Sequence, residues 1–255
     1  MADGLPLNRG DRPVTGKPPG AGDNAVTVPG PRLTDRELIN SWVLVSSFGP
    51  YVTALRERYS QIPEGADTGI GYVYVDPFCG ISLKVECLCI GDDERLGGDA
   101  SFPLSDHASL RFRYSALRKL DLKHLDGEEV QRFDLPEIPE WTRSYGTPDL
   151  TLTRNFRWLD PFRAPGFFDD VMAVLHRKEG NVPELVWVRL SRYIPETDRF
   201  VSTMLNEPFR GTGVHKNDVV EVQVVREPGG ISLLVIPVRV SPEDRAGAGG
   251  SRALQ

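Results

Sequence analysis

A group of polar and aromatic residues in the C-terminal half of the chain could form a binding surface. Its members are Trp187, Arg189, Asn206, Glu207 and His215. A tryptophan with a neighbouring arginine is the composition typical of contact centres between proteins. The amide, carboxylate and imidazole groups that follow can all form directed hydrogen bonds, and the polar stretch ends at Asp218. The pattern predicts a polar binding rim at one end of a β-rich domain.

The same residues also have an ordinary structural explanation, which the sequence favours. Asparagine and aspartate are expected at turns in any case. Tryptophan is a large, mostly apolar side chain, so Trp187 fits a core position better than an exposed one. Pro208 holds Glu207 in an extended conformation, and Phe209 should pack into the core. The binding rim is therefore a hypothesis that depends on the geometry of the folded chain.

No catalytic, metal-binding or phosphate-binding motif is recognisable. The four histidines are not spaced for a zinc site with one another or with a cysteine pair, so the sequence predicts neither a metal nor a cofactor. Cys87 and Cys89 are two residues apart on an expected strand, so both should face the core with Ile81 and Leu83. These cysteines are expected to be structural.

Charge and composition narrow the classes of partner. The chain has 255 residues and a formal net charge of −6. It has no basic stripe of the kind that neutralises phosphates, so nucleic-acid binding is not predicted. No stretch approaches the ~20 apolar residues that a membrane span needs, and the N-terminus lacks the apolar core of a signal peptide. We expect a cytoplasmic protein that contacts no membrane.

The elements of the N-terminal half follow from capping and periodicity. Thr34 to Glu37 fits a capping box that begins a helix. The residues 42–45 fit either its continuation or a short strand. A second helix is expected from Pro50 to Tyr59. The alternation beyond Gly71 predicts a small antiparallel sheet with one face in water.

The C-terminal half has the clearest pattern, with five expected strands. They are Val171–His176, Leu185–Tyr193, Phe200–Leu205, Val219–Val225 and Ile231–Val238. Short strands with frequent turn signals suggest a small barrel or a strongly bent sheet. The first of the five also fits one or two turns of helix, so that alternative stays open.

The predicted class is α+β, with N-terminal helices on a small antiparallel sheet followed by a barrel-like or bent-sheet domain. The division has five parts: a disordered segment 1–30, an α+β domain 31–133, a connector 134–166, a β-rich domain 167–240 and a flexible tail 241–255. The connector is rich in proline and aromatic residues and should be irregular, anchored on the surface by its rings. Whether the two halves form one domain or two is open.

Three motifs carry a resemblance to a known group of domains. They are Leu185–Leu190, Met204–Phe209 and a polar turn leading into Asp218–Val222. With these motifs the residues 165–238 resemble small bacterial domains, mostly of unknown function, some of which are proposed as immunity proteins in polymorphic toxin systems. Those domains typically have glycine before the aspartate, where this chain has Asn217, which also tolerates a left-handed turn. The resemblance implies a fold more than an activity.

Three functional hypotheses follow, in descending order. The first is a non-catalytic protein-binding module, with another protein, in the immunity-like case a toxin, as the partner. The second is a hydrolase with its site between the two halves and Glu207 or His215 as the base. The third is a structural subunit of a larger assembly. The sequence leans against an enzyme and leaves the oligomeric state open.

Overall fold

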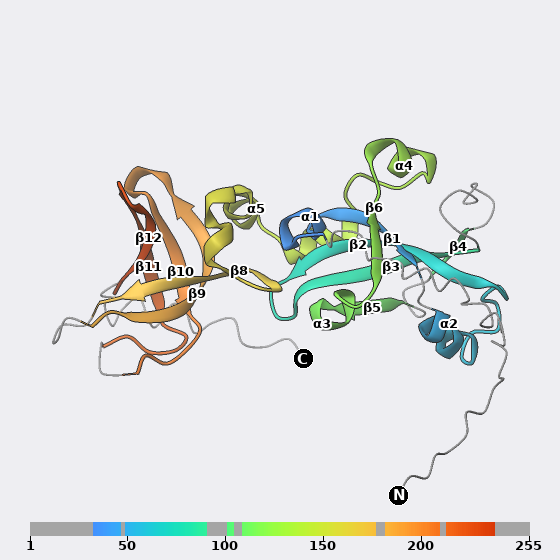
Figure 1. Ribbon diagram of the computed structural model, residues 1–255, viewed down its shortest axis with the longest axis horizontal. Coiled ribbons are helices and arrows are strands. Elements are labelled where there is room, and N and C mark those ends of the chain that lie inside the picture. The colour runs from blue at the N-terminus through green and yellow to red at the C-terminus, as the bar shows by residue number, and fades with distance from the viewer. Residues whose placement is uncertain are drawn as a thin grey trace, which may run out of the picture. The chain divides into compact units, whose positions relative to one another are not determined.

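The computed structural model describes residues 33–46, 49–90, 101–104, 109–176, 182–209 and 213–237. They form two β-sheets, sheet A before residue 125 and sheet B after residue 162, with helices between and around the strands (Figure 1). The α+β class is confirmed. The expected segments 1–30 and 241–255 lie outside the described residues.

Sheet A is antiparallel in all its pairings, with the strand order β4-β3-β2-β1-β6 and β5 paired to β3. Its strands are β1 (Ser41–Ser46), β2 (Ala66–Asp76), β3 (Gly80–Ile90), β4 (Ser101–Pro103), β5 (Leu110–Arg113) and β6 (Asp121–His124). Its helices are α1 (Asp35–Leu38), α2 (Gly49–Arg56), α3 (Tyr114–Leu117) and α4 (Gly127–Arg132).

The first helix is confirmed but is only one turn long. Thr34 and Glu37 form the predicted capping box, with the Glu37 carboxylate accepting from the Thr34 N–H at 2.7 Å. Asn40 then adopts a left-handed conformation with φ of 55°, which ends the helix. The residues 42–45 are consequently in a strand, which settles the ambiguity between helix and strand.

Apolar cores cover both faces of sheet A, so the prediction that one face is exposed to water is wrong. The first core packs the sheet against the helices and includes Val43, Val45, Val73, Val75, Ile81, Leu83, Val85 and Leu88. The second core lies on the opposite face and includes Trp42, Leu44, Ile70, Tyr72, Tyr74 and Cys89. Trp141 and Tyr145 of the connector pack on this second core. The central strands β1 and β2 are accordingly apolar on both sides, as expected for strands that are buried on both faces.

The two cysteines of β3 do not lie where simple alternation places them. The pairing of β2 with β3 skips Glu86, an extra residue that forms a β-bulge. Because one extra residue inverts the alternation of side chains, Ile81 and Leu83 face the first core whereas Cys87 and Cys89 face the second. The prediction of a shared face is therefore wrong, although Cys89 is buried as expected.

The connector is more regular than expected. It contains the 3-10 helix η2 (Glu140–Tyr145), α5 (Pro148–Asn155) and the 3-10 helix η3 (Arg157–Phe162). Thr147 caps α5 by accepting from the Leu150 N–H at 3.2 Å, and proline occupies the first turn. Its aromatic anchors are confirmed: rings of η2 pack on sheet A, and Phe156 and Trp158 pack against the core of sheet B.

Sheet B contains all five predicted strands. They are β8 (Phe167–Leu175), β9 (Glu184–Ile194), β10 (Arg199–Met204), β11 (Val219–Glu227) and β12 (Gly230–Ile236), preceded by the short β7 (Arg163–Ala164) and interrupted by the 3-10 helix η4 (Pro195–Thr197). In Figure 1 these strands are coloured yellow to red. The first of the five is a strand, which excludes its helical alternative.

The five strands close into a barrel. Neighbours along the chain pair antiparallel, and β12 pairs in parallel with β8, joining Val235 to Leu175. An odd number of alternating strands can close only with one parallel pair. The interior is filled by apolar side chains, among them Phe200, Val220 and Val222, so the barrel is a packed core.

Phe168 of β8 packs into the first core of sheet A, and several polar contacts beside it involve α1. Arg36 donates two hydrogen bonds to Asp160 of η3 at 2.6 and 2.5 Å, and Asp160 also accepts from Arg163 at 3.1 Å. Asp35 accepts from the Tyr114 hydroxyl at 2.8 Å and from the backbone N–H at position 166 at 2.9 Å. The expected boundaries at 133 and 166 stay a prediction, but these bonds tie the parts together.

Candidate functional sites

The predicted rim is assembled in part. The Asn206 side chain accepts from the backbone N–H of Trp187 at 2.7 Å. The Glu207 carboxylate lies 2.7 Å from Nδ1 of His215 and accepts from the Lys216 N–H at 2.9 Å. These bonds fix the corner after β10 and the turn before β11 in a defined geometry.

Arg189 lies apart from the rim. It makes a bidentate ion pair with Asp170 of β8 at 2.6 and 2.9 Å and also donates to the carbonyl of Pro77 in the β2–β3 turn. The hydrogen bond to Asp170 raises the pKa of Arg189, which is already a permanent cation. Its guanidinium is therefore engaged within the chain and helps to connect the two sheets.

Trp187 lies on the outer face of the barrel, so its expected core position is wrong. The ring alternates with Val186 and Val188, and these two valines fill the interior instead. Trp187 is 37% exposed, and Leu185 on the same face of β9 is 61% exposed. Alternation alone could not tell the two faces of this strand apart, because both carry apolar residues.

Neighbouring strands extend this outer face into an apolar surface, which we call the outer strip. It consists of Met172 and Val174 of β8, Leu185 and Trp187 of β9, and Leu234 of β12. The register pairs Met172 with Trp187, Val174 with Leu185, and Leu234 with Val174, so the five side chains are contiguous. Side chains opposite one another on adjacent strands are in reach of contact. The barrel thus carries apolar groups that its own interior does not use.

Phe209 is a further exposed apolar residue and does not pack in the core as expected. It is 85% exposed, while Pro208 before it is buried. The Phe209 N–H donates to the carboxylate of Glu184 at 2.6 Å, which places it next to the start of β9. At this corner the buried residue is Pro208, whereas the sequence predicted that Phe209 would be buried.

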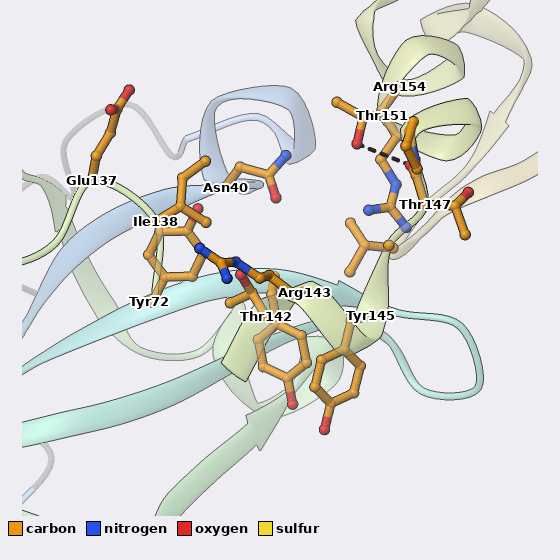
Figure 2. Close-up of a pocket in the computed structure, with 14 residues that line it drawn as sticks. Asn40, Tyr72, Glu137, Ile138, Thr142, Arg143, Tyr145, Thr147, Thr151 and Arg154 are labelled. Carbon is orange, nitrogen blue, oxygen red and sulfur yellow. Dashed lines mark hydrogen bonds between the residues drawn. The ribbon is translucent and has the colours of Figure 1, made fainter. Parts of the chain in front are cut away.

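A cavity of about 550 Å³ opens between the second face of sheet A and the connector. Figure 2 shows Asn40, Tyr72 and Arg143 on one side of it and Thr147, Thr151 and Arg154 on the other. The α5 helix positions Arg154, and β2 positions Tyr72. No residue of the predicted rim lines this cavity.

The environment of Glu207 does not favour the general-base role that the hydrolase hypothesis gives it. The backbone N–H of Lys216 and the His215 ring hold the pKa of Glu207 below its usual range, which makes this exposed carboxylate a weaker base. Within the ranges that the structure describes, no three acidic, histidine or cysteine side chains cluster as metal ligands. In the same part of the chain, no helix is long and apolar enough to cross a membrane.

Compared with protein-family models, curated proteins and solved structures, the chain shows no match. The geometry therefore carries the functional argument by itself. Sequence reasoning missed two features: the outer strip, because its members come from three strands, and the cavity, because its walls come from residues far apart in the sequence. Only the aromatic density of the connector pointed towards the cavity.

Proposed function

We propose that this chain is a non-catalytic protein-binding module that contacts its partner through the outer strip. The observation that carries the proposal is the orientation of Trp187 and Leu185. Both point away from a barrel whose interior is already filled, so they are not needed for the core. Contiguous exposed apolar groups of this kind are typical of interaction sites, and tryptophan is enriched among the residues that dominate binding energy.

The backbone of Trp187 is hydrogen-bonded to the corner after β10. Its N–H donates to Asn206, and its carbonyl accepts from the Leu205 N–H at 2.9 Å. Both bonds lie on the β10 side of the strand and fix its backbone at the position of the ring. A contact surface that is already ordered loses less conformational entropy on binding, which favours affinity. This gives Asn206 a positioning role.

The partner is proposed to be a basic protein that presents apolar side chains. The chain has a net charge of −6, and Glu184 directly precedes Leu185 of the strip at the start of β9. Complementary charge around an apolar centre increases the association rate and discriminates between partners. In the form that the resemblance to immunity domains supports, this partner is a toxin that the chain neutralises.

The test is quantitative capture from native lysate with tagged full-length protein, comparing wild type, Trp187→Ala and Phe78→Ala. Phe78 is 87% exposed on the β2–β3 turn, outside the strip, so it is a matched aromatic control. Wild type and Phe78→Ala should capture a specific partner in similar amounts. Trp187→Ala should capture at least about tenfold less of it. Binding should also weaken as salt increases.

Other outcomes would count against the proposal. Equal capture by all three proteins would show that the outer strip is not part of the interface. Self-association on a sizing column that Trp187→Ala abolishes would identify a second copy as the occupant, in agreement with the subunit hypothesis. If the captured partner inhibits growth when expressed alone, co-expression of wild type but not of Trp187→Ala should restore growth, and failure to do so would exclude the immunity-like role.

A further inference from the structure

The cavity beside sheet A contains a buried hydroxyl with no protein partner in the described part of the chain. Tyr72 is 1% exposed, and among the described residues nothing hydrogen-bonds to its hydroxyl. Burial raises the pKa of Tyr72 to about 12, so the group stays protonated and can donate. Because a buried polar group without a partner is costly, its position on a cavity wall suggests that the partner is a ligand.

A second donor faces the same space. Arg154 is 6% exposed and uses Nε and Nη2 in a bidentate pair with Asp169 at 2.8 and 2.6 Å. Its remaining nitrogen, Nη1, has no hydrogen bond to any described residue and lies towards Gly146, where the absent side chain leaves the approach open. Figure 2 shows the Arg154 guanidinium directed into the cavity, across from Asn40.

The remaining walls are mainly aromatic and aliphatic. Tyr145 lines the cavity and packs against Tyr74 with ring centroids 4.8 Å apart, and Ile138 and Pro148 add apolar surface. Arg143 lies at the edge, paired at 3.3 Å with Glu140. A volume of about 550 Å³ is in the range of small-molecule sites, which combine apolar walls with a few convergent polar groups.

The charge balance distinguishes among anions. Asp169 compensates Arg154, Glu140 compensates Arg143, and Glu137 adds a carboxylate at the wall. A phosphate dianion would meet too little positive charge here. A single carboxylate needs less positive charge than a phosphate dianion, and its two oxygens accept from donors such as a phenol and a guanidinium.

We infer that this cavity is a binding site for a small carboxylate with an aromatic or branched apolar body. The carboxylate accepts from the Tyr72 hydroxyl and from Nη1 of Arg154, and the body packs among Tyr145, Ile138 and Pro148. This site is separate from the outer strip, so it stands or falls independently of the proposed protein partner.

The probes are phenylacetate, its neutral analogue phenylacetamide, and acetate, titrated into full-length protein by calorimetry at concentrations up to about 10 mM. Trp42 and Trp141 lie with ring centroids 5.2 and 6.4 Å from that of Tyr72, so their fluorescence gives a second readout. Phenylacetate should bind. Phenylacetamide should bind at least about tenfold more weakly because it lacks the charge, and acetate likewise because it lacks the apolar body.

Two variants test the assignment. Tyr72→Phe removes only the hydroxyl and should weaken phenylacetate at least about fivefold while leaving the melting temperature of the free protein unchanged or higher. Gly146→Val places methyl groups in front of Arg154 Nη1, since a Cβ there has only this nitrogen within 4 Å, at 3.7 Å. It should fold and lose binding. Gly127→Val, at another glycine with open space, is the control.

The proposal is overturned if none of the probes binds, or if phenylacetate binds equally well to Tyr72→Phe and Gly146→Val. It is also overturned if Tyr72→Phe lowers the melting temperature of the free protein, because the hydroxyl would then already have a structural partner.

Discussion

Gly80 and Gly166 approach each other so closely that a Cβ on Gly80 would lie 2.1 Å from the Gly166 carbonyl oxygen. The same carbonyl accepts from the Ile81 N–H at 2.7 Å. A Cβ on Gly166 would in turn lie 2.5 Å from the Tyr114 ring. Both glycines have positive φ, 74° and 79°, a conformation that disfavours other residues. The contact between the β2–β3 hairpin and the β7–β8 turn is therefore made by backbone.

Gly166→Ala should destabilise the protein by about 2–4 kcal/mol, because it combines a left-handed backbone with a collision against Tyr114. Urea unfolding measures the change in the free energy of unfolding. Gly229→Ala is the control, since a Cβ there meets nothing within 4 Å, and it should change stability by less than about 0.5 kcal/mol. Equal effects would show that the close contact does not form.

Asp160 should give the protein a defined sensitivity to acid. Burial raises the pKa of Asp160, but the bonds to Arg36 and Arg163 outweigh burial and hold it below the usual value. The ion pair therefore stabilises the fold above the unfolded pKa of about 3.9, and this contribution is lost as the pH falls through the lower folded pKa. Asp160→Asn should cost about 1–2 kcal/mol at pH 7.

The pH dependence separates that ion pair from a simple packing effect. The difference in stability between wild type and Asp160→Asn should shrink below about pH 4. Asp121→Asn, at an exposed position of β6, should behave as wild type throughout. A difference that stays constant down to pH 2 would mean that the charge of Asp160 contributes nothing.

Removing one partner of the buried Arg154–Asp169 pair should strongly destabilise the protein, whereas replacing both partners by apolar residues should not. Both side chains are less than a tenth exposed and joined by two hydrogen bonds. Arg154→Met strands the Asp169 charge and should cost about 3–5 kcal/mol, whereas Arg154→Met with Asp169→Leu should recover most of that loss. Denaturant titration of the two variants checks this, and a double variant that is no more stable than Arg154→Met would contradict the pairing.

Trp187 and Phe200 should differ sharply in their effect on folding. Phe200 is fully buried in the barrel, and its replacement by alanine should cost about 3–5 kcal/mol. Trp187→Ala removes a half-exposed ring from the outer strip and should cost less than about 1.5 kcal/mol. Thermal and urea unfolding give both values. A comparable loss in the two variants would place Trp187 in the core after all.

Much of the barrel could be predicted because its strands alternate cleanly. In β11 the inward valines Val220, Val222 and Val224 alternate with polar residues, so both the strand and its buried face follow from the sequence. The faces of β3 did not follow, because Glu86 inserts a bulge that no local pattern announces. Simple alternation is a sound guide only where no extra residue enters the ladder.

The candidate sites were predicted less completely. The sequence grouped Asn206, Glu207 and His215 because they flank two adjacent strand ends, and Glu207 does bond to His215 while Asn206 bonds to the backbone of Trp187. That these residues form a binding rim stays a prediction. It could not join Tyr72 to Arg154, which come from β2 and α5 and meet only through the packing of the connector. The decisive property there is a hydroxyl without a partner, which exists only in the folded structure.

The parallel pairing of β8 with β12 restricts how this barrel could be rearranged genetically. Strands that run in the same direction begin at the same end, so the start of β8 and the end of β12 lie at opposite ends of the barrel. The register pairs Val235 with Leu175, so the two strands end at the same level and the nine residues of β8 separate the two points. That distance is about 30 Å at ~3.3 Å per residue. A circular permutant of the barrel that joins these two points needs a linker of roughly nine residues or more, whereas a barrel with an even number of strands could be closed by a tight turn.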